Sequence, residues 1–478
     1  MKKSIFKERV MEHSMELSPF FEPKNLAIIG SFREGLFGGF VAVQSLKQAG
    51  FKGEIYPINP MYDEVLGLKV YPSLGRVPAE VDLALVMVNA RTVPGIITEC
   101  AAKSVRGIIV VSDGFAERDE EGARLQEEIV RLARSRGIRL LGPNTAGVVN
   151  TANGFNLCPY KGGDYTLKRG SVAICAQTGM INPQAVPYRG PSLGVSKICD
   201  FGNRCDVDES DMLEYLEKDP ETNVISMYLE SVRDGGKFLE TAARVGARKP
   251  VLVLKSGRTS EGARASASHT GSMAMDDDIF DAACAQTGML RLDDYNDLFE
   301  MPKIFAAGRP AIGNRLGIVT FTGCIAVLAI DEGAKHGLEP AGLSHHTGSF
   351  LDGIFPGLGK MPVDIGPAMA AVKDAFDRYP AILRTVAEDD RVDCLFSVIW
   401  ANPDPHIISC YIEAYGKMQS LCRKAVATWV YGPDPAVTIE TAARIENMGF
   451  PTFSRPETAI KALGLAVRRG TRLRTKAR

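Results

Sequence analysis

Short, almost unbroken apolar runs alternate with helix-length segments along most of this 478-residue sequence. In the first part of the chain these runs lie at 25–30, 54–59, 81–88, 107–112 and 138–142, and residues 40–49 have a helical pattern. A strand buried on both faces reads as an apolar run, and strands separated by helices pair in parallel. Because the crossovers must be right-handed, this part of the sequence predicts a doubly wound, Rossmann-like α/β domain.

Two more series of the same kind follow. The second has apolar runs at 172–175, 195–198, 223–229 and 250–255, and the third has them at 315–320, 392–399 and 425–430. The length of the chain also agrees with three domains of about 150 residues each. We therefore expect three doubly wound parallel-sheet domains, over residues 17–150, 165–308 and 312–467, with 150–170 as a linker and 468–478 as a frayed basic tail.

Composition excludes several classes of partner and location. The net charge is −1, so no bulk field attracts nucleic acid or an anionic membrane. No apolar run reaches the ~18 residues of a membrane span, and the N-terminal segment lacks the apolar stretch of a secretory signal. The ten cysteines show no C-x-x-C spacing, so we expect reduced thiols in a cytoplasmic protein, without disulfides or a metal site.

Glycine is enriched, with 47 residues in the chain, and one cluster of glycines follows the first predicted strand. The turn from Gly30 to Gly39 opens the helix at 40–49, so its backbone N–H groups can face a phosphate at the positive helix end. The spacing is not G-x-G-x-x-G, and the second strand ends in Asn59-Pro60 without the acid that binds a ribose. This pattern favours a nucleotide held through its diphosphate over NAD, with a flexible turn as the alternative.

A second turn of this type lies at Cys175–Ile181. Gln177, Thr178 and Gly179 offer a hydroxyl and successive N–H groups that suit a phosphate. An ordinary N-terminal cap by Thr178 is the alternative, because threonine is common at that position.

Two side chains could carry group-transfer chemistry. His269 lies in a stretch of Ala, Ser, Thr and Gly without apolar period, which predicts an exposed loop, and a neutral imidazole can accept a phosphoryl group. Glu230 closes the strand at 223–229, at the edge where ligands bind, and can orient an imidazole. A surface histidine and a solvated or salt-bridged glutamate are the alternatives. The string His-Thr-Gly-Ser occurs again at 346–349, which we interpret as coincidence.

Several longer motifs resemble a known family. They are Ile55-Tyr-Pro-Ile-Asn-Pro60, Gly142-Pro-Asn144, Gly202-Asn203 with Asp206-Val-Asp208, Tyr228-Leu-Glu230, and Lys255-Ser-Gly-Arg258 with Ser268-His-Thr-Gly271. From about Leu17 onward the chain resembles the α subunit of ADP-forming (NDP-forming) acyl-CoA synthetases, in the succinyl-CoA synthetase superfamily. The resemblance implies a Rossmann-like CoA-binding domain followed by two flavodoxin-like ligase domains.

The resemblance also implies a reaction, in which acyl-CoA, phosphate and ADP give a carboxylic acid, CoA and ATP through an acyl phosphate. His269 would become phosphorylated, in preference to His346, and Glu230 would hold its imidazole. Phosphate would bind at Gln177, Thr178 and Gly179. The residues that would bind CoA are Gly30, Ser31, Gly38, Gly39, Asn59, Pro60, Asn144 and Thr145.

Three segments depart from the family pattern. Thr145 stands where the family usually has cysteine, the turn Thr320–Ile325 lacks the usual glycines, and Met361 replaces the asparagine of Asn-Pro-Val-Asp. The sequence has no segment for an ATP-grasp unit, so we expect a separate β subunit that binds ATP or ADP with Mg²⁺, in an α2β2 heterotetramer. An inactive CoA-binding scaffold is the main alternative, and a Rossmann oxidoreductase is disfavoured.

Overall fold

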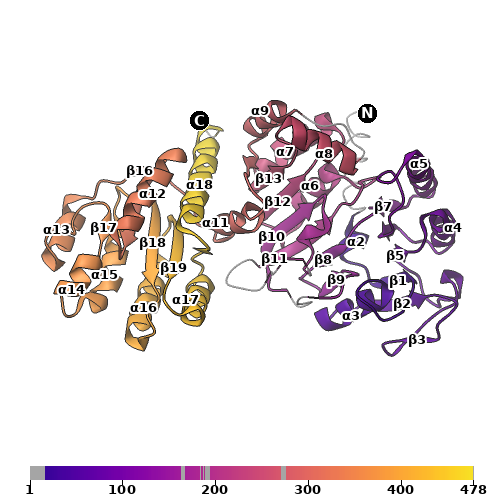
Figure 1. The fold of residues 1–478 in the computed structure, drawn as a ribbon, viewed down its shortest axis with the longest axis horizontal. Helices are drawn as coiled ribbons and strands as arrows, with labels where there is room; N and C mark the ends of the chain where they lie inside the picture. Colours follow the sequence, from indigo (N-terminus) through magenta and orange to yellow (C-terminus); the bar gives the residue numbers. More distant parts are fainter. Residues whose placement is uncertain are drawn as a thin grey trace, which may run out of the picture. The chain divides into compact units, whose positions relative to one another are not determined.

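The structure is a computed structural model that describes residues 17–162, 167–183, 185–186, 188, 194–270 and 276–476. The chain divides into two compact units: unit 1 is Met1–Arg189 with Gly194–Asp294, and unit 2 is Gly190–Leu193 with Tyr295–Arg478. Unit 1 contains two large sheets and unit 2 contains one (Figure 1). Each apolar run predicted from the sequence lies in a strand of one of these sheets.

The first sheet has five parallel strands in the order β2-β1-β5-β6-β7. Their bounds are β1 Asn25–Gly30, β2 Glu54–Ile58, β5 Leu83–Met87, β6 Gly107–Val110 and β7 Arg139–Leu141. Successive residues of a strand point to opposite faces, and both faces are buried here: Ile28 and Leu85 belong to one core, and Ile29 and Val86 to another. This two-sided burial is why the strands read as apolar runs.

Helices, a hairpin and short turns precede or connect these strands. They are α2 Ser18–Phe21, α3 Gly39–Ala49, α4 Val93–Ala102 and α5 Glu120–Arg134, with the hairpin β3 Glu64–Val65 and β4 Leu68–Lys69 and the 3-10 turns η1 Leu74–Arg76 and η2 Ala90–Thr92. The predicted helix at 40–49 corresponds to α3.

The second sheet is mixed, in the order β14-β13-β12-β10-β11-β8-β9. Its parallel strands are β10 Arg169–Ala176, β11 Val195–Asp200, β12 Val224–Leu229, β13 Val251–Lys255 and β14 Leu290–Arg291. The prediction of a linker at 150–170 is wrong in part, because β8 Val148–Asn150 and β9 Phe155–Leu157 join this sheet as antiparallel strands. Helices α6 Glu209–Lys218, α7 Gly235–Gly246, α8 Ser260–Thr270 and α9 Asp277–Thr287, and the turn η3 Gly179–Ile181, complete this part.

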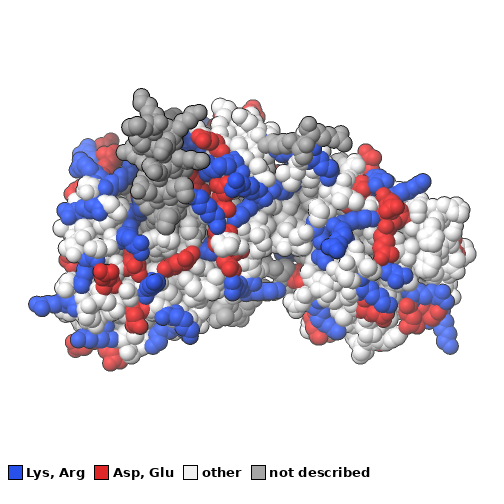
Figure 2. Space-filling view, turned by 180° about the vertical axis from the view of Figure 1, so that it is seen from behind, with Lys and Arg blue, Asp and Glu red and all other residues white. Residues whose placement is uncertain are grey.

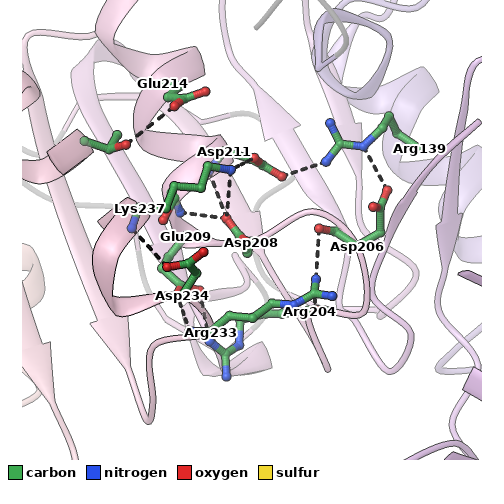
Figure 3. Close-up of polar contacts among 12 residues, drawn as sticks. Arg139, Arg204, Asp206, Asp208, Glu209, Asp211, Glu214, Arg233, Asp234 and Lys237 are labelled. Atoms are coloured by element: carbon green, nitrogen blue, oxygen red, sulfur yellow. Dashed lines mark hydrogen bonds and ion pairs between the residues drawn. The ribbon is translucent and has the colours of Figure 1, made fainter. Parts of the chain in front are cut away.

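An ion-pair cluster ties the first two sheets together within unit 1 (Figure 3). Asp206 accepts hydrogen bonds from Arg134 at 2.8 Å and from Arg139 at 2.8 Å, and Arg139 also donates to Asp211 at 2.6 Å. Lys237 of α7 pairs with Asp211 as well. In the motif Asp206-Val-Asp208, which contributed to the family resemblance, Asp206 thus pairs with Arg139 of β7, and Asp208 accepts from Ser210 N–H and Asp211 N–H at the start of α6.

The third sheet has the order β16-β15-β18-β19-β20, and β17 also pairs with β15. The strands are β15 Arg315–Thr320, β16 Glu339–Pro340, β17 Val363–Asp364, β18 Cys394–Trp400, β19 Ala425–Tyr431 and β20 Thr452–Phe453. The helices are α10 Asp297–Glu300, α11 Pro302–Ala306, α12 Gly323–Lys335, α13 His345–Ile354, α14 Gly366–Ala371, α15 Ala375–Glu388, α16 Pro405–Leu421, α17 Pro435–Asn447 and α18 Pro456–Lys476.

The C-terminal residues differ from the expectation of a frayed tail. Helix α18 continues to Lys476, and Arg474 within it donates to the carbonyl oxygen of Ala311 at 3.2 Å. Lys461, nearer the start of α18, pairs with Asp297 of α10 at 2.6 Å. The domain boundaries predicted from the sequence stay a prediction.

The three sheets share one topology. Numbered along the chain, five parallel strands of each sheet follow the order 2-1-3-4-5, which is typical of flavodoxin-like folds and places ligands beside the first strand at its carboxyl end. In the third sheet these are β16-β15-β18-β19-β20, and β17 is an additional parallel strand that pairs with β15. On the surface drawn in Figure 2, positive and negative side chains are interspersed, without a large patch of one sign. Within the described ranges, no helix is long and apolar enough to cross a membrane.

Candidate functional site

The turn after β1 is built by close packing as well as by glycine conformations. Gly38 has φ of +121°, and a side chain on Gly39 would lie 2.8 Å from the carbonyl oxygen of Ser31. The N–H of Gly38 donates to Pro159 at 2.9 Å and that of Gly39 donates to Ser31 at 3.1 Å. These two predicted phosphate donors therefore already have partners, and the next N–H groups in the first turn of α3 are candidates to face an anion.

Asn59 and Gly30 support the same turn. The Asn59 amide donates to the carbonyl oxygen of Gly30 at 2.7 Å and its side-chain oxygen accepts from Met61 N–H at 2.8 Å. A side chain on Gly30 would lie 2.9 Å from the carbonyl oxygen of Met87 on β5. Asn59 therefore braces the turn, while Pro60 is exposed beside it and Ser31 Oγ lies 3.2 Å from the Tyr62 hydroxyl.

A cavity of about 560 Å³ lies at the carboxyl ends of β5 and β6. Its lining includes Asn89, Arg91, Asp113 and Arg118, together with Asn144 from the turn after β7. Carboxyl ends of parallel strands are where doubly wound domains bind ligands. Asn144 is exposed in this cavity, and its predicted contact with CoA stays a prediction.

Asn203 holds one rim of this cavity from the second sheet. Its side-chain amide donates to Glu117, and the other carboxylate oxygen of Glu117 accepts from the N–H of Gly114 at 2.5 Å and of Phe115 at 3.0 Å. The Gly202-Asn203 motif thus fixes a loop of the first sheet.

Thr145 lies deeper than predicted and its hydroxyl is engaged. It is buried, donates to the carbonyl oxygen of Asp200 at 2.6 Å and accepts from Gly147 N–H at 3.0 Å. The Asp200 carboxylate accepts from the N–H groups of Ala146 at 2.6 Å and Gly202 at 3.0 Å. Burial raises the pKa of Asp200 to about 6, against the stabilising effect of these N–H donors. Sequence reasoning missed Asp200, although its position at the end of an apolar strand could have indicated it.

The predicted phosphate turn and Glu230 form one hydrogen-bonded unit. Thr178 Oγ accepts from Met180 N–H at 3.2 Å and caps η3, while Gly179 is exposed. Gln177 is buried instead, and its side-chain oxygen accepts from the N–H of Glu230 at 2.5 Å and of Ser231 at 3.2 Å. Gln177 therefore positions the backbone that carries Glu230, and its predicted contact with phosphate stays a prediction.

Tyr228 orients the Glu230 carboxylate and was missed by sequence reasoning. Its hydroxyl donates to Glu230 Oε1 at 3.2 Å. Burial raises the pKa of Tyr228, and Glu230 adds to this effect, so the hydroxyl keeps its proton at neutral pH. The alternation of the strand carried the signal, because Tyr228 lies two residues before Glu230 and the two share a side of β12.

His269 lies near the end of helix α8, which follows the strand next to β12. The expectation of a loop is wrong for its backbone, since α8 extends over Ser260–Thr270, while residues 271–275 and the side chain of His269 lie outside what the structure describes. Strands β12 and β13 pair at Leu229 and Lys255, and Ser256 N–H donates to Leu229 at 3.0 Å. The segment leading to His269 thus starts beside Glu230.

Comparison with known proteins defines the class to which this fold and site belong. Residues 24–151 match the CoA binding domain, and residues 169–305 match the succinyl-CoA ligase like flavodoxin domain. The first sheet therefore belongs to a CoA-binding domain, and the second sheet belongs to a flavodoxin-like ligase domain.

Relatives that align with almost the whole chain identify the family more narrowly. The chain is 33% identical to the α subunit of acetate–CoA ligase (ADP-forming) II of Pyrococcus furiosus, over 93% of this chain and 96% of that subunit. It is 37% identical to acetate–CoA ligase (ADP-forming) II of Archaeoglobus fulgidus, but spans only 66% of that protein's length. The chain belongs to the family of α-type chains of ADP-forming acyl-CoA synthetases, in the succinyl-CoA ligase superfamily.

A solved structure agrees with this assignment. The dinucleotide-forming acetyl-coenzyme A synthetase 1 of Candidatus Korarchaeum cryptofilum, in complex with phosphate and ADP, has a TM-score of 0.85 and 30% identity. The alignment covers 96% of this chain and 97% of that one.

Proposed function

We propose that this chain is the α-type part of an enzyme that interconverts acyl-CoA, phosphate and ADP with a carboxylic acid, CoA and ATP. The observation that carries the proposal is the unit of Gln177 and Glu230, because it joins a turn suited to phosphate with a carboxylate suited to an imidazole. The family of the chain and its CoA-binding domain support the same reaction.

Two transfers at the site would release the acid. A phosphate oxygen attacks the thioester carbonyl carbon, the C–S bond breaks, and CoA leaves as a thiolate that takes up a proton. An imidazole nitrogen of His269 then attacks the phosphorus of the acyl phosphate, and the carboxylate leaves. Glu230, with its carboxylate held by Tyr228, accepts the other ring N–H and stabilises the charge of the phosphorylated ring. ADP finally takes the phosphoryl group and becomes ATP.

CoA would bind across the carboxyl edge of the first sheet. Its diphosphate would face the first turn of α3 and Ser31, with the turn braced by Asn59. The cavity that Asn144 lines would hold a further part of the molecule. We propose small carboxylic acids as the substrate class, since the relatives cited above are named for acetate.

A separate β subunit would bind the nucleotide and Mg²⁺ through an ATP-grasp unit, in an α2β2 assembly. Relatives named as α subunits support a partner chain. We assign no residue of this chain to the Mg²⁺ ion.

Labelling of the histidine tests the proposal. The chain is co-expressed with a β-type partner, incubated with radiolabelled ATP, and the acid-labile phosphate is mapped. We expect the label at His269, its loss in His269→Asn, and its retention in the control His346→Asn. Retained CoA binding without any label would instead indicate a non-catalytic scaffold. ADP–ATP exchange by the isolated chain would contradict the need for a partner.

A further inference from the structure

Three side chains of unit 2 direct different donor atoms toward one another. His406 and Cys410 lie on α16 four residues apart, which places them on one face of the helix, and Asp377 lies on the adjoining helix α15. His406 Nε2 is 2.9 Å from Asp377 Oδ1, and Cys410 Sγ is 4.0 Å from each of these two atoms. Among the described residues, this is the group of His, Cys and acidic side chains with metal-binding geometry.

The arrangement is that of a chelate and not of a catalytic relay. In a cysteine–histidine–aspartate relay, the carboxylate faces one ring nitrogen and the sulfur faces the other. Here the carboxylate and the sulfur both face Nε2 of His406. Three donors that face a common point fit an ion placed between them.

The donor types select the kind of ion. Sulfur, imidazole nitrogen and carboxylate oxygen together suit Zn²⁺ and similar transition metals, whereas Mg²⁺ and Ca²⁺ take oxygen ligands. With Zn–S at about 2.3 Å and Zn–N or Zn–O at about 2.0 Å, tetrahedral ligands lie roughly 3.3–3.6 Å apart. The observed 2.9–4.0 Å separations reach this range through small rotations, which the exposed side chains of Asp377 and His406 permit.

The surroundings add negative charge and an opening to solvent. The carboxylates of Asp404 and Glu413 lie near enough to act on the Cys410 thiol, although Lys417 also pairs with Glu413. The Asp377 and His406 side chains are 56% and 63% exposed, while Cys410 is buried. An ion would enter from the solvent side and keep a water molecule as its fourth ligand.

We propose that Asp377, His406 and Cys410 bind one thiophilic divalent transition-metal ion, of the Zn²⁺ type, that ties α15 to α16. On binding, the Cys410 thiol releases its proton to solvent and the sulfur coordinates as a thiolate. The tie has a structural purpose, because Pro380 lies inside α15 and removes a hydrogen bond from the turn that carries Asp377.

Cobalt binding by the full chain tests this site without substrate or partner. The chain is stripped with a chelator and titrated with Co²⁺ in oxygen-free buffer, and the sulfur-to-cobalt charge-transfer absorption is recorded. We expect one Co²⁺ per chain, displaced by Zn²⁺. Cys410→Ser should abolish the absorption, and His406→Gln or Asp377→Asn should weaken Co²⁺ binding about tenfold or more.

The control is Cys324→Ser, which removes the exposed thiol on α12 and should leave the titration unchanged. Because Cys410 is buried, the folding of its variant is first checked by circular dichroism. If that variant does not fold, the titrations of His406→Gln and Asp377→Asn, at exposed positions, test the proposal. Absence of the absorption, binding unaffected by the His406 and Asp377 variants, or loss of binding in Cys324→Ser would overturn the proposal.

Discussion

The first parallel strands of the second and third sheets, β10 and β15, end in turns of similar geometry. After β10 the chain reads Ala176-Gln-Thr-Gly179, and after β15 it reads Thr320-Phe-Thr-Gly323. An aspartate of the neighbouring strand pairs with the last strand residue in each case, Asp200 in one sheet and Asp364 in the other. Each aspartate accepts from the glycine N–H two residues on, at 3.0 Å. The two turns therefore have the same neighbouring acid, on β11 in the second sheet and on the additional strand β17 in the third.

A single position separates the two turns chemically. Gln177 accepts hydrogen bonds from the backbone that carries Glu230, whereas Phe321 at the equivalent position stacks on Tyr379 at 5.5 Å and contacts Tyr411 edge-on at 5.7 Å. One turn is joined to a carboxylate, and the other is joined to an aromatic core. The strand order places such a turn at the end of the first parallel strand. The side chain at its second position, Gln177 or Phe321, determines which part of the sheet the turn contacts.

The largest effect should come from Glu230, the carboxylate that follows β12 and is joined to Gln177. Glu230→Gln removes the negative charge proposed to orient His269, so we expect phosphorylation of His269 to fall about 100-fold or more. The measurement is the rate of labelling by ATP with the partner present. Asn402→Ala, which changes a polar residue shortly after β18 in the third sheet, is the control and should label normally. A normal rate in Glu230→Gln would break the proposed role.

Alanine substitutions of Gln177 and Phe321 should show that these two side chains have different roles. Phe321→Ala removes a ring from the aromatic core and should destabilise unit 2 by about 3 kcal/mol. Gln177→Ala leaves two buried N–H groups without their acceptor and should cost unit 1 about 1–3 kcal/mol. Hydrogen exchange during urea unfolding assigns the loss of protection to a unit.

Only the Gln177 variant should also slow the labelling of His269, because the backbone of Glu230 depends on it. Equal effects of both variants on labelling would show that the third sheet's turn is coupled to the chemistry.

Asp200 at the end of β11 and Asp206 in the segment after it should give opposite pH dependences of stability. Burial raises the pKa of Asp200 to about 6, so between about pH 4 and 6 the folded chain keeps a proton that the unfolded chain has lost, and stability falls as pH rises. Burial also opposes ionisation of Asp206, but Arg139, the Leu140 N–H and Arg134 together outweigh it, and the pKa of Asp206 is lowered. The stabilisation from Asp206 is therefore present above about pH 4 and lost below it.

Unfolding free energies at pH 4 and pH 6 distinguish these cases. The stability of Asp200→Asn relative to wild type should rise by up to about 3 kcal/mol between the two values. Asp206→Asn should be destabilised by a nearly constant amount over the same interval. A flat difference for Asp200→Asn would mean that its carboxylate is ionised throughout.

Long apolar runs made the fold predictable, and short polar segments did not. Strands such as β1 and β10 were recognised because burial on both faces leaves a continuous apolar signal. The antiparallel strands β8 and β9 were missed because each has three residues in a stretch rich in glycine and asparagine. Helix α8 was missed because its small residues give no apolar period.

At the site, the sequence indicated the turns and the acid but not their connections. Glu230 was predicted from its position after a strand. The hydrogen bond from its N–H to the Gln177 side chain, however, joins residues 53 positions apart and depends on the register of β10 and β12. The same limit applies to the proposed ion site: the His406 and Cys410 spacing is visible in the sequence, but Asp377 reaches them only through helix packing.

The smallest effect concerns the threonines that the two turns share. Thr178 Oγ accepts from Met180 N–H at 3.2 Å, whereas Thr322 makes no side-chain capping bond although it precedes α12. Thr178→Ala should therefore cost about 1 kcal/mol of stability, and Thr322→Ala should cost only a few tenths. Paired urea titrations of the two variants measure the difference. If Thr178 also binds phosphate, its variant should weaken inhibition of labelling by inorganic phosphate, which Thr322→Ala should leave unchanged. Equal losses in both variants would mean that the two turns are alike in chemistry as well as in shape.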